Sequence, residues 1–442
     1  MNIEELKNIL KANGVVGAGG AGFPSYAKLN EKADTIILNC AECEPLLKLH
    51  RQVLEKYPRE ILSALITVAN TVGATRICVA VKPNYKKTVA ALQSVLPEFP
   101  NIELSMLPNV YPAGDEVVTI YEAIGRVVPP GQLPISVGVI VYNVETVLNM
   151  YYAILGVKPV YEKYVTVTGA VRNPVTLKVP LGITFEELIA LAGGTELSDF
   201  TIISGGPMTG PVGNLYDVVT KTTNGIIVLP DDHYVVLKKT ANLSISKKRA
   251  MAACCQCNMC TDRCPRHALG HPIDPADFMR GVSSVNTNKR EAFVNSLFCS
   301  SCGLCEMYSC NQALSPRSLI DEMKGALRAG GVKCADPVFS SVDKNREGKF
   351  VSIPRLRARL DLDKYDHQAP VVDADINPKM VKLLLSQHIG APAVADIAVG
   401  ETVEKGQLIA KASDTALGVN IHASINGKVT EVTDRYIIIE RG

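Results

Sequence analysis

The chain has 442 residues, and its 46 Lys and Arg against 44 Asp and Glu give a net charge of +2. This balance excludes the strong positive field that draws proteins to nucleic acid or anionic membranes, so neither is expected as a partner. No run of about 18 apolar residues occurs and the start is unlike a signal peptide, so we expect a cytoplasmic protein without a membrane span, built of two to four domains.

Residues 1–157 alternate helical patterns with short, continuous apolar runs. Such runs are typical of strands buried on both faces of a parallel sheet. Helical spacing lies between them, as in REILSALITVANTVG. The runs lie at 35–39, 76–81, 102–107 and 137–142. The alternation predicts an α/β domain with a Rossmann-like, three-layer arrangement.

Residues 158–245 have shorter strand patterns separated by turn residues. Candidate strands are YVTVTGAVRNP, TLKVP, IIVLP and HYVVLKK, with a turn-rich loop, GGPMTG, at 205–210. TFEELIALAGG is a helical pattern that ends at Gly193 and Gly194, a favourable C-terminal stop. We therefore expect a small β-rich domain folded around one helix.

The last two hundred residues differ in composition from the rest. Residues 246–333 place two cysteine groups among helical patterns, and 334–367 form a polar, basic connecting segment. Short strands with regular turns, such as GKVTEVT and YIIIE, follow in 368–442 and predict an all-β sandwich or barrel. The whole chain is thus predicted to be an α/β multidomain protein.

Eight of the thirteen cysteines stand in two groups with almost the same spacing, C-x2-C-x2-C-x3-C-P and C-x2-C-x2-C-x4-C. One loop with this spacing places three thiolates around a four-iron cluster, and the fourth cysteine reaches the other cluster. The spacing therefore predicts two [4Fe–4S] clusters. The expected ligands are Cys254, Cys257, Cys260 and Cys310 for one cluster, and Cys264, Cys299, Cys302 and Cys305 for the other.

Structural zinc is the alternative for these cysteines. Zinc sites generally use two C-x2-C pairs that lie apart in sequence, which does not explain three cysteines followed by a fourth and Pro265. The second group has one extra residue before Cys310 and Asn311 in place of proline, which a one-residue bulge would accommodate. We expect the remaining cysteines to be buried small hydrophobes: Cys40, Cys43, Cys78, Cys255 and Cys334.

Four glycines fall within positions 17–22. A dinucleotide-binding glycine motif follows a strand and opens a helix, whereas this one follows a helical pattern and runs into Phe23 and Pro24. A simple Rossmann fingerprint is therefore not indicated. The glycines still allow the backbone to approach a flat or anionic ligand closely.

Polar residues follow three of the predicted strands. Carboxyl ends of parallel strands share one edge of a sheet, where ligands bind, so we expect these residues to lie together. Helix capping by Asp115 and Thr146 would explain part of the pattern equally well. The residues are Asn39, Glu42 and Glu44, then Tyr111, Gly114, Asp115 and Glu116, and finally Asn143, Glu145 and Thr146.

The motifs GAGGAGFP, NCAECEP, YPAGDE and YNVET resemble the flavin- and NADH-binding subunit of respiratory complex I, and more closely the C subunit of Rnf electron-transfer complexes. The resemblance implies four domains: an FMN domain, a β-grasp domain of the SLBB type, a two-cluster ferredoxin-like segment and a barrel-sandwich hybrid. In the Rnf protein, the barrel-sandwich part lies at the N-terminus. Its C-terminal place here resembles the cobalamin reductases of propanediol-utilisation microcompartments.

The resemblance implies specific cofactor contacts. Ala41 and Tyr142 replace an acidic residue and an asparagine of complex I, which implies a weaker or exchangeable flavin. The NADH side would be lined by Phe23, Glu44 and Glu116. The FMN contacts implied are Gly17, Gly19, Gly20, Lys28, Asn39, Glu42, Tyr111, Gly114, Asp115, Glu116, Asn143 and Thr146.

The same resemblance implies a function. NADH would supply electrons through FMN and the two clusters to a corrinoid, reducing cob(III)alamin to cob(II)alamin and then to cob(I)alamin for an adenosyltransferase. Further implied partners are microcompartment shell proteins, with a location inside the microcompartment. No corrin site is evident, because His267 and His271 near the first cysteine group are ordinary surface or supporting histidines on sequence grounds.

Two other functions remain open at this point. A protein of the Rnf type would pass electrons between NADH and ferredoxin, although the C-terminal barrel-sandwich position disfavours it. A ferredoxin-like relay whose α/β domain has lost its nucleotide would not be an enzyme. The tip SDTALG (413–418) has no lysine, so no lipoyl or biotinyl attachment is expected.

Overall fold

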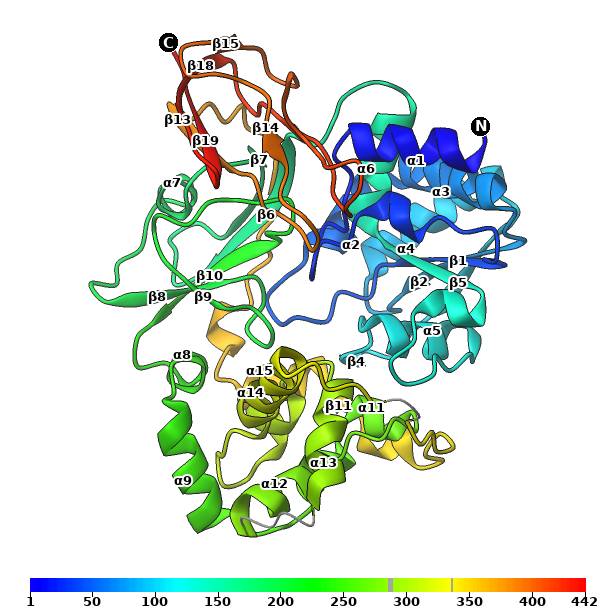
Figure 1. Cartoon of the computed structure of the whole chain (residues 1–442), viewed down its shortest axis with the longest axis vertical. Coiled ribbons are helices and arrows are strands. Elements are labelled where there is room, and N and C mark those ends of the chain that lie inside the picture. The colour runs from blue at the N-terminus through cyan, green and yellow to red at the C-terminus, as the bar shows by residue number, and fades with distance from the viewer. Residues whose placement is uncertain (285–288, 335–336) are drawn as a thin grey trace.

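The computed structural model describes residues 1–284, 289–334 and 337–442. Figure 1 shows the N-terminal region beside a green β-rich region, with a yellow-green helical segment at one end and the red C-terminal sheets at the other. Within the described residues, no helix combines the length and apolar character that a membrane crossing requires.

The N-terminal region is built on a parallel sheet with the order β3-β2-β1-β5. The strands predicted at 35–39 and 76–81 are confirmed to the residue. Side chains alternate along β1, so that Ile36 and Leu38 join one apolar cluster while Ile37 joins another. The strands are β1 (Thr35–Asn39), β2 (Arg76–Val81), β3 (Ile102–Met106) and β5 (Val139–Asn143).

Helices cover both faces of this sheet. Helix α5 (Glu116–Ile124) packs on one face, and the others lie on the opposite face. The sequence sets the helix ends: Asn2 begins the first helix with a capping box, and Gly73, with φ of 81°, ends the third. The helices of the opposite face are α1 (Ile3–Ala12), α2 (Leu49–Lys56), α3 (Pro58–Val72), α4 (Lys86–Val95) and α6 (Val144–Ile154).

The second region is a six-stranded mixed sheet with the order β12-β7-β6-β10-β8-β9, packed on α7 (Phe185–Leu191). The strand predicted at HYVVLKK is wrong, because these residues form α8 (Tyr234–Lys239), which His233 caps through Val235 N. The strands are β6 (Glu162–Gly169), β7 (Val175–Pro180), β8 (Phe200–Ser204), β9 (Val212–Gly213), β10 (Gly225–Pro230) and β12 (Val371–Val372).

Strand β12 was predicted as part of the C-terminal unit, yet it pairs in parallel with β7. The cysteine segment is helical as predicted, and a short pair, β4 (Val110–Tyr111) with β11 (Val351–Ser352), joins the connecting segment to the first region. The helices here are α9 (Leu243–Ala253), α10 (Met259–Asp262), α11 (Pro265–Ala268), α12 (Pro275–Ser284), α13 (Arg290–Val294), α14 (Pro316–Ala329) and α15 (Ile353–Arg359).

The C-terminal region contains two antiparallel sheets, with the orders β13-β19-β18-β15 and β14-β16-β17. It packs back on the start of the chain: the buried Lys221 ammonium donates to the carbonyls of Gly14 and Asn420, each at 2.8 Å. The strands are β13 (Met380–Leu384), β14 (Val394–Ala395), β15 (Thr402–Val403), β16 (Leu408–Lys411), β17 (Ile421–His422), β18 (Gly427–Val432) and β19 (Tyr436–Glu440).

Candidate functional site

A cavity of about 420 Å³ opens where β1 and β5 end, at the carboxyl edge of the parallel sheet. This is the edge at which open α/β sheets bind ligands. The structure brings most of the predicted cofactor residues together here. Those that line the cavity are Gly17, Gly19, Gly20, Phe23, Lys28, Asn39, Glu42, Glu44, Gly114, Glu116, Asn143 and Thr146.

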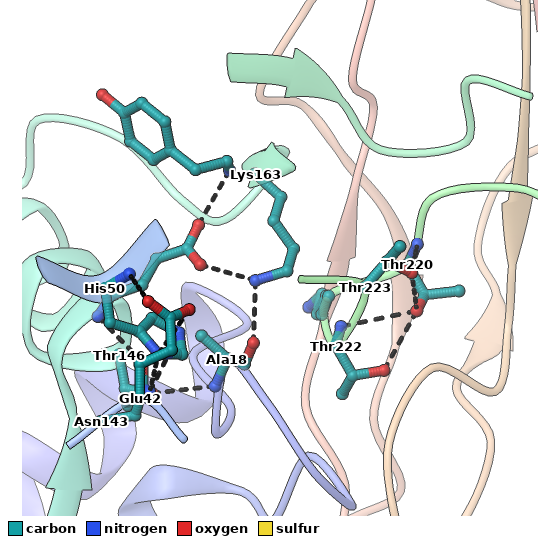
Figure 2. A network of polar contacts seen from close by, with 12 residues as sticks. Ala18, Glu42, His50, Asn143, Thr146, Lys163, Thr220, Thr222 and Thr223 are labelled. Atoms are coloured by element: carbon teal, nitrogen blue, oxygen red, sulfur yellow. Dashed lines mark hydrogen bonds and ion pairs between the residues drawn. The ribbon is translucent and has the colours of Figure 1, made fainter. Parts of the chain in front are cut away.

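The glycine loop is held in place from two sides (Figure 2). The peptide N–H of Ala18 donates to Thr146 Oγ1 at 2.8 Å, and its carbonyl accepts from Lys163 Nζ at 2.8 Å. Lys163 also pairs with Glu145 at 2.6 Å, and both side chains are only 2% exposed. Burial lowers the pKa of Lys163, which the Glu145 charge opposes. The loop is therefore fixed to both the first and the second region.

One cation faces the cavity at the end of the sheet. Lys28 Nζ donates to Glu116 Oε1 at 2.7 Å and to the carbonyl of Val141 at 2.9 Å. Across the cavity floor, Asn39 donates to the Gly114 carbonyl at 3.0 Å. A side chain at Gly114 would bring its Cβ within 2.3 Å of the Ala41 carbonyl, so glycine is required there.

A buried polar group forms another wall (Figure 2). Glu42 lies 3.7 Å from His50 Nδ1 through its Oε1, which has no hydrogen-bond partner among the described residues. Burial raises the pKa of Glu42 to about 7 and lowers that of His50 to about 3. Asn143 Nδ2 lies 3.1 Å from His50 Nε2. Near neutral pH, Glu42 can therefore donate or accept a proton beside a neutral imidazole.

The cavity fits a flat polar cofactor such as FMN. The second region contributes Asn224, whose Oδ1 is buried and unpartnered among the described residues, as is Glu42 Oε1. Gly19 has no side chain, and a Cβ there would lie 2.6 Å from Asn224 Nδ2. Two unsatisfied buried oxygens facing one cavity are costly unless a ligand with donor groups fills it.

Three predicted residues are used differently from the expectation. Tyr111 and Asp115 do not line the cavity: the Tyr111 hydroxyl donates to the Cys302 carbonyl at 2.5 Å, and Asp115 pairs with Arg266 at 2.9 Å. The Glu44 carboxylate lines the cavity but accepts from Met208 N, Thr209 N and Thr209 Oγ1 of the GGPMTG loop. In this structure it is therefore not free to bind a ribose.

Four of the predicted cluster ligands line one cavity of their own, and we call them the outer set. Cys257 is exposed, and the three others are partly exposed. Two residues of their loop, Gln256 and Asn258, have positive φ of 55° and 68°. Such alternation turns peptide N–H groups inward around an anionic cluster. The outer set is Cys254, Cys257, Cys260 and Cys310.

The other four cysteines form the inner set, which lies nearer the first region. Burial raises the pKa of Cys305 well above its usual value, and the charges of the three other thiolates raise it further, as expected for neighbours. Ser301 and Gly303 have positive φ of 58° and 79°, at the same places in the loop as in the outer set. The inner set is Cys264, Cys299, Cys302 and Cys305.

The extra residue of the second cysteine group has a structural explanation. A π-helical turn covers Cys305–Ser309, directly before Cys310. A π-turn accommodates one inserted residue in a helix, so the predicted bulge is confirmed. Among the described residues, no three His, Cys, Asp or Glu side chains converge closely enough to hold a single metal ion. The four sulfurs of the outer set surround a cavity, as a cluster requires.

Sequence reasoning missed His50, Asn224 and the role of Lys163. His50 lies within α2, one helical turn or more beyond the NCAECEP motif, and it carried no motif signal. Asn224 and Lys163 come from the second region. Only contact between regions brings them to the cavity, which no local pattern shows.

Family models match four consecutive parts of the chain. They are the Nuo51 FMN-binding domain at residues 10–152, the SLBB domain at 164–212, a 4Fe-4S dicluster domain at 253–315 and the RnfC barrel sandwich hybrid domain at 361–442. The order agrees with the domain types expected from the motifs. The FMN match spans the residues that surround the cavity at the sheet edge.

Several known proteins are similar to this chain. Cobalamin reductase PduS of Salmonella typhimurium (strain LT2) is 39% identical over 443 residues, covering 100% of this chain and 98% of that protein. The protein of the same name from Citrobacter freundii is 39% identical over 99% of this chain and 97% of its own length. The RnfC-type component of the Na(+)-translocating ferredoxin:NAD(+) oxidoreductase complex of Acetobacterium woodii is 31% identical over 63% of this chain and 61% of that protein.

Solved structures support the fold. An NAD+-reducing [NiFe]-hydrogenase in the H2-reduced state superposes with a TM-score of 0.50 at 16% identity, covering 76% of this chain and 68% of the hydrogenase chain. At this identity the likeness concerns the fold alone.

Proposed function

We propose that this chain, which belongs to the family of the cobalamin reductases PduS, passes electrons from NADH to a corrinoid by way of FMN and two [4Fe–4S] clusters. Family membership, together with an FMN-binding and a dicluster domain, makes the chain an electron-transferring oxidoreductase. The substrate, the use of NADH and the presence of two clusters are the proposal.

One observation carries this proposal. The inner set of cysteines is bound to the first region through Tyr111 and Arg266, while the outer set faces away with Cys257 exposed. The residues are thus arranged as an entrance, a connection and an exit. When bound, FMN would take two electrons from NADH as hydride, and each cluster would carry one electron at a time.

The residues around the cavity would hold and orient these groups. Lys28 supplies a positive charge for a phosphate or an anionic reduced flavin, and Asn39 and Asn143 supply amides for the polar flavin edge. Phe23 and Glu116 would line the NADH side, with Glu44 reaching NADH only if the GGPMTG loop releases it. Glu42, with a pKa near 7, is suited to hold a proton at the cavity wall.

The partners follow from the product. Cob(I)alamin is consumed by an adenosyltransferase, and we propose that such an enzyme and microcompartment shell proteins are the neighbours of this chain, inside a bacterial microcompartment. We also keep the predicted domain borders as part of the proposal: 1–157, 158–245, 246–333, 334–367 and 368–442.

The direct test is anaerobic NADH oxidation with hydroxocobalamin as acceptor. The wild type should form cob(II)alamin, visible in the absorption spectrum. Cys257→Ala removes a ligand of the outer set and should lower this rate at least about tenfold. Cys255→Ala is the matched control, because Cys255 is the exposed neighbour that lies outside the ligand spacing, and it should keep the wild-type rate.

Cofactor content tests the proposal independently of turnover. Denaturation of the wild type should release FMN, and iron content should fall in Cys257→Ala but stay unchanged in Cys255→Ala. A colourless supernatant would identify a relay without flavin and contradict the proposal.

An Rnf-type function is the second candidate, favoured by the 31% identity with the Acetobacterium woodii protein. Under it, the wild type would reduce ferredoxin rapidly and hydroxocobalamin not at all. Copurification with membrane proteins of such a complex would support the same conclusion.

A further inference from the structure

A second cleft opens at the carboxyl edge of the parallel sheet, on the other side of β1 from the flavin cavity. Its volume is about 920 Å³, against about 420 Å³ for the flavin cavity. Loops that follow β1, β2 and β3 line it, and residues of the connecting segment between 353 and 371 close it. Its place at the carboxyl edge is that of a ligand site in an open α/β sheet.

A single strip of chain separates the two cavities. Lys82 Nζ and the Tyr85 hydroxyl, both at the end of β2, donate to the carbonyl of Glu42 at 3.1 and 2.6 Å. These bonds fix the strip, so ligands in the two cavities would lie one loop apart. The residues that line both cavities are Glu42, Cys43, Glu44 and Leu47.

The far wall of the cleft neutralises its own cations. Lys48 pairs with Asp366 at 2.9 Å, and Arg357 pairs with the same carboxylate. Lys56 pairs with Asp373 at 2.5 Å. These contacts join α2 to the connecting segment and complete the cleft.

Three other lining cations have no acidic partner within 4.0 Å among the residues that the structure describes. Arg51 lies over the Tyr85 ring, 4.6 Å from its centre. Lys86 and Lys87 are exposed in the first turn of α4, where Tyr85 provides no side-chain cap. Positive charges there oppose the helix dipole, and a bound anion would relieve this and pair with the free N–H groups.

We propose that this cleft binds the corrinoid substrate, with Arg51, Lys86 and Lys87 holding the phosphodiester of its nucleotide tail. The inference rests on the proposed function and adds the place where the substrate binds. A corrinoid is much larger than a flavin and carries peripheral amides, which suit a wide cleft lined by polar side chains. Asn84, Asn109 and Gln368 provide such partners.

The test compares two corrinoids that differ in the phosphodiester. Cyanocobalamin has it, and dicyanocobinamide does not. Calorimetric titration of the flavin- and iron-loaded protein should show that Arg51→Ala/Lys86→Ala/Lys87→Ala weakens cyanocobalamin binding at least about tenfold, since three charge-assisted contacts are lost. Binding of dicyanocobinamide should change less than about twofold.

A matched control keeps the net charge change in view. Lys379→Ala/Lys428→Ala removes two exposed lysines of the C-terminal region and should leave both affinities unchanged. The single variant Lys86→Glu provides a second reading and should weaken cyanocobalamin binding more than Lys86→Ala does. Flavin and iron content verify that each variant is folded.

The outcomes separate this proposal from the function on which it rests. If the wild type reduces hydroxocobalamin while the triple variant binds cyanocobalamin as tightly as the wild type does, the cleft assignment is wrong and the function stands. A raised KM for NADH with unchanged corrinoid binding would assign the cleft to the dinucleotide pyrophosphate and also overturn the proposal. Absence of any corrinoid reduction by the wild type would instead overturn the proposed function.

Discussion

The two cysteine loops share one backbone course and differ in their surroundings. Each has positive φ two and four residues after its first cysteine, at Gln256 and Asn258 in the outer loop and at Ser301 and Gly303 in the inner loop. The outer loop lies at the surface, whereas the inner loop packs against the first region. The same local structure thus serves an exit in one place and an internal connection in the other, and only the tertiary contacts distinguish the two.

Removing one ligand from each set would produce the largest effect on this comparison. Cys305→Ala should abolish electron passage from NADH to either set, because the inner set adjoins the first region. Cys257→Ala should leave the inner cluster reducible by NADH. Electron paramagnetic resonance after anaerobic addition of NADH would measure this, and equal loss of reduced-cluster signal in both variants would contradict the order.

The ion pair that joins the inner side to the first region gives the next largest effect. Arg266→Gln leaves the largely buried Asp115 without its partner, which should lower the free energy of unfolding by about 2 kcal/mol. Arg263→Gln is the control, since this exposed side chain makes no ion pair within the described ranges. Urea unfolding followed by circular dichroism measures both, and identical midpoints would show that the pair does not hold the interface.

A buried histidine on the inner side should make stability depend on pH. His271 Nε2 lies 3.0 Å from the Val128 carbonyl, and burial lowers its pKa to about 4. The unfolded chain binds a proton at higher pH than the native chain, so this stability is present above pH 6.5 and is lost as pH falls toward 4. Between pH 7.5 and 5.5 the loss should be roughly 1.4 kcal/mol.

The comparison for this prediction is His271→Gln, which cannot titrate. The difference in unfolding free energy between wild type and variant should change over that pH range. A constant difference would mean that the histidine has the same pKa in both states.

The smallest effect concerns one hydroxyl. Tyr111→Phe removes the hydrogen bond to the Cys302 carbonyl and should cost about 1 kcal/mol in stability. Tyr216→Phe should cost nothing measurable, because Tyr216 is 80% exposed. Thermal unfolding of the two variants side by side would measure this, and equal losses would place the bond outside the energetics of the interface.

Local patterns predict the parts of the fold that are locally determined. The strands at 35–39 and 76–81 follow from apolar runs bounded by turns, and the sheet edge follows from parallel order. HYVVLKK is too short to separate helix from strand by periodicity, and His233 decides it by capping. The place of β12 beside β7 depends on a partner about two hundred residues earlier, which no local pattern shows.

The candidate site divides in the same way. Residues that follow strand ends, such as Asn39 and Asn143, could be predicted to meet at one edge. Tyr111 and Asp115 follow strand patterns too, but contacts with the cysteine segment draw their polar atoms elsewhere. The second cleft needs the connecting segment as its far wall, and a pairing across such sequence distance has no signature in the residues alone.

The contacts of Lys221 have a consequence for the history of the chain. The C-terminal region packs on Gly14 through this lysine, and Asn420 N donates to the Lys11 carbonyl at 3.2 Å. Both termini lie toward the same end of the molecule (Figure 1). A circularly permuted gene that encodes residues 368–442 first could therefore keep the module in its present position. The placement of this module at opposite ends of related chains is then a difference in gene order that the three-dimensional structure tolerates.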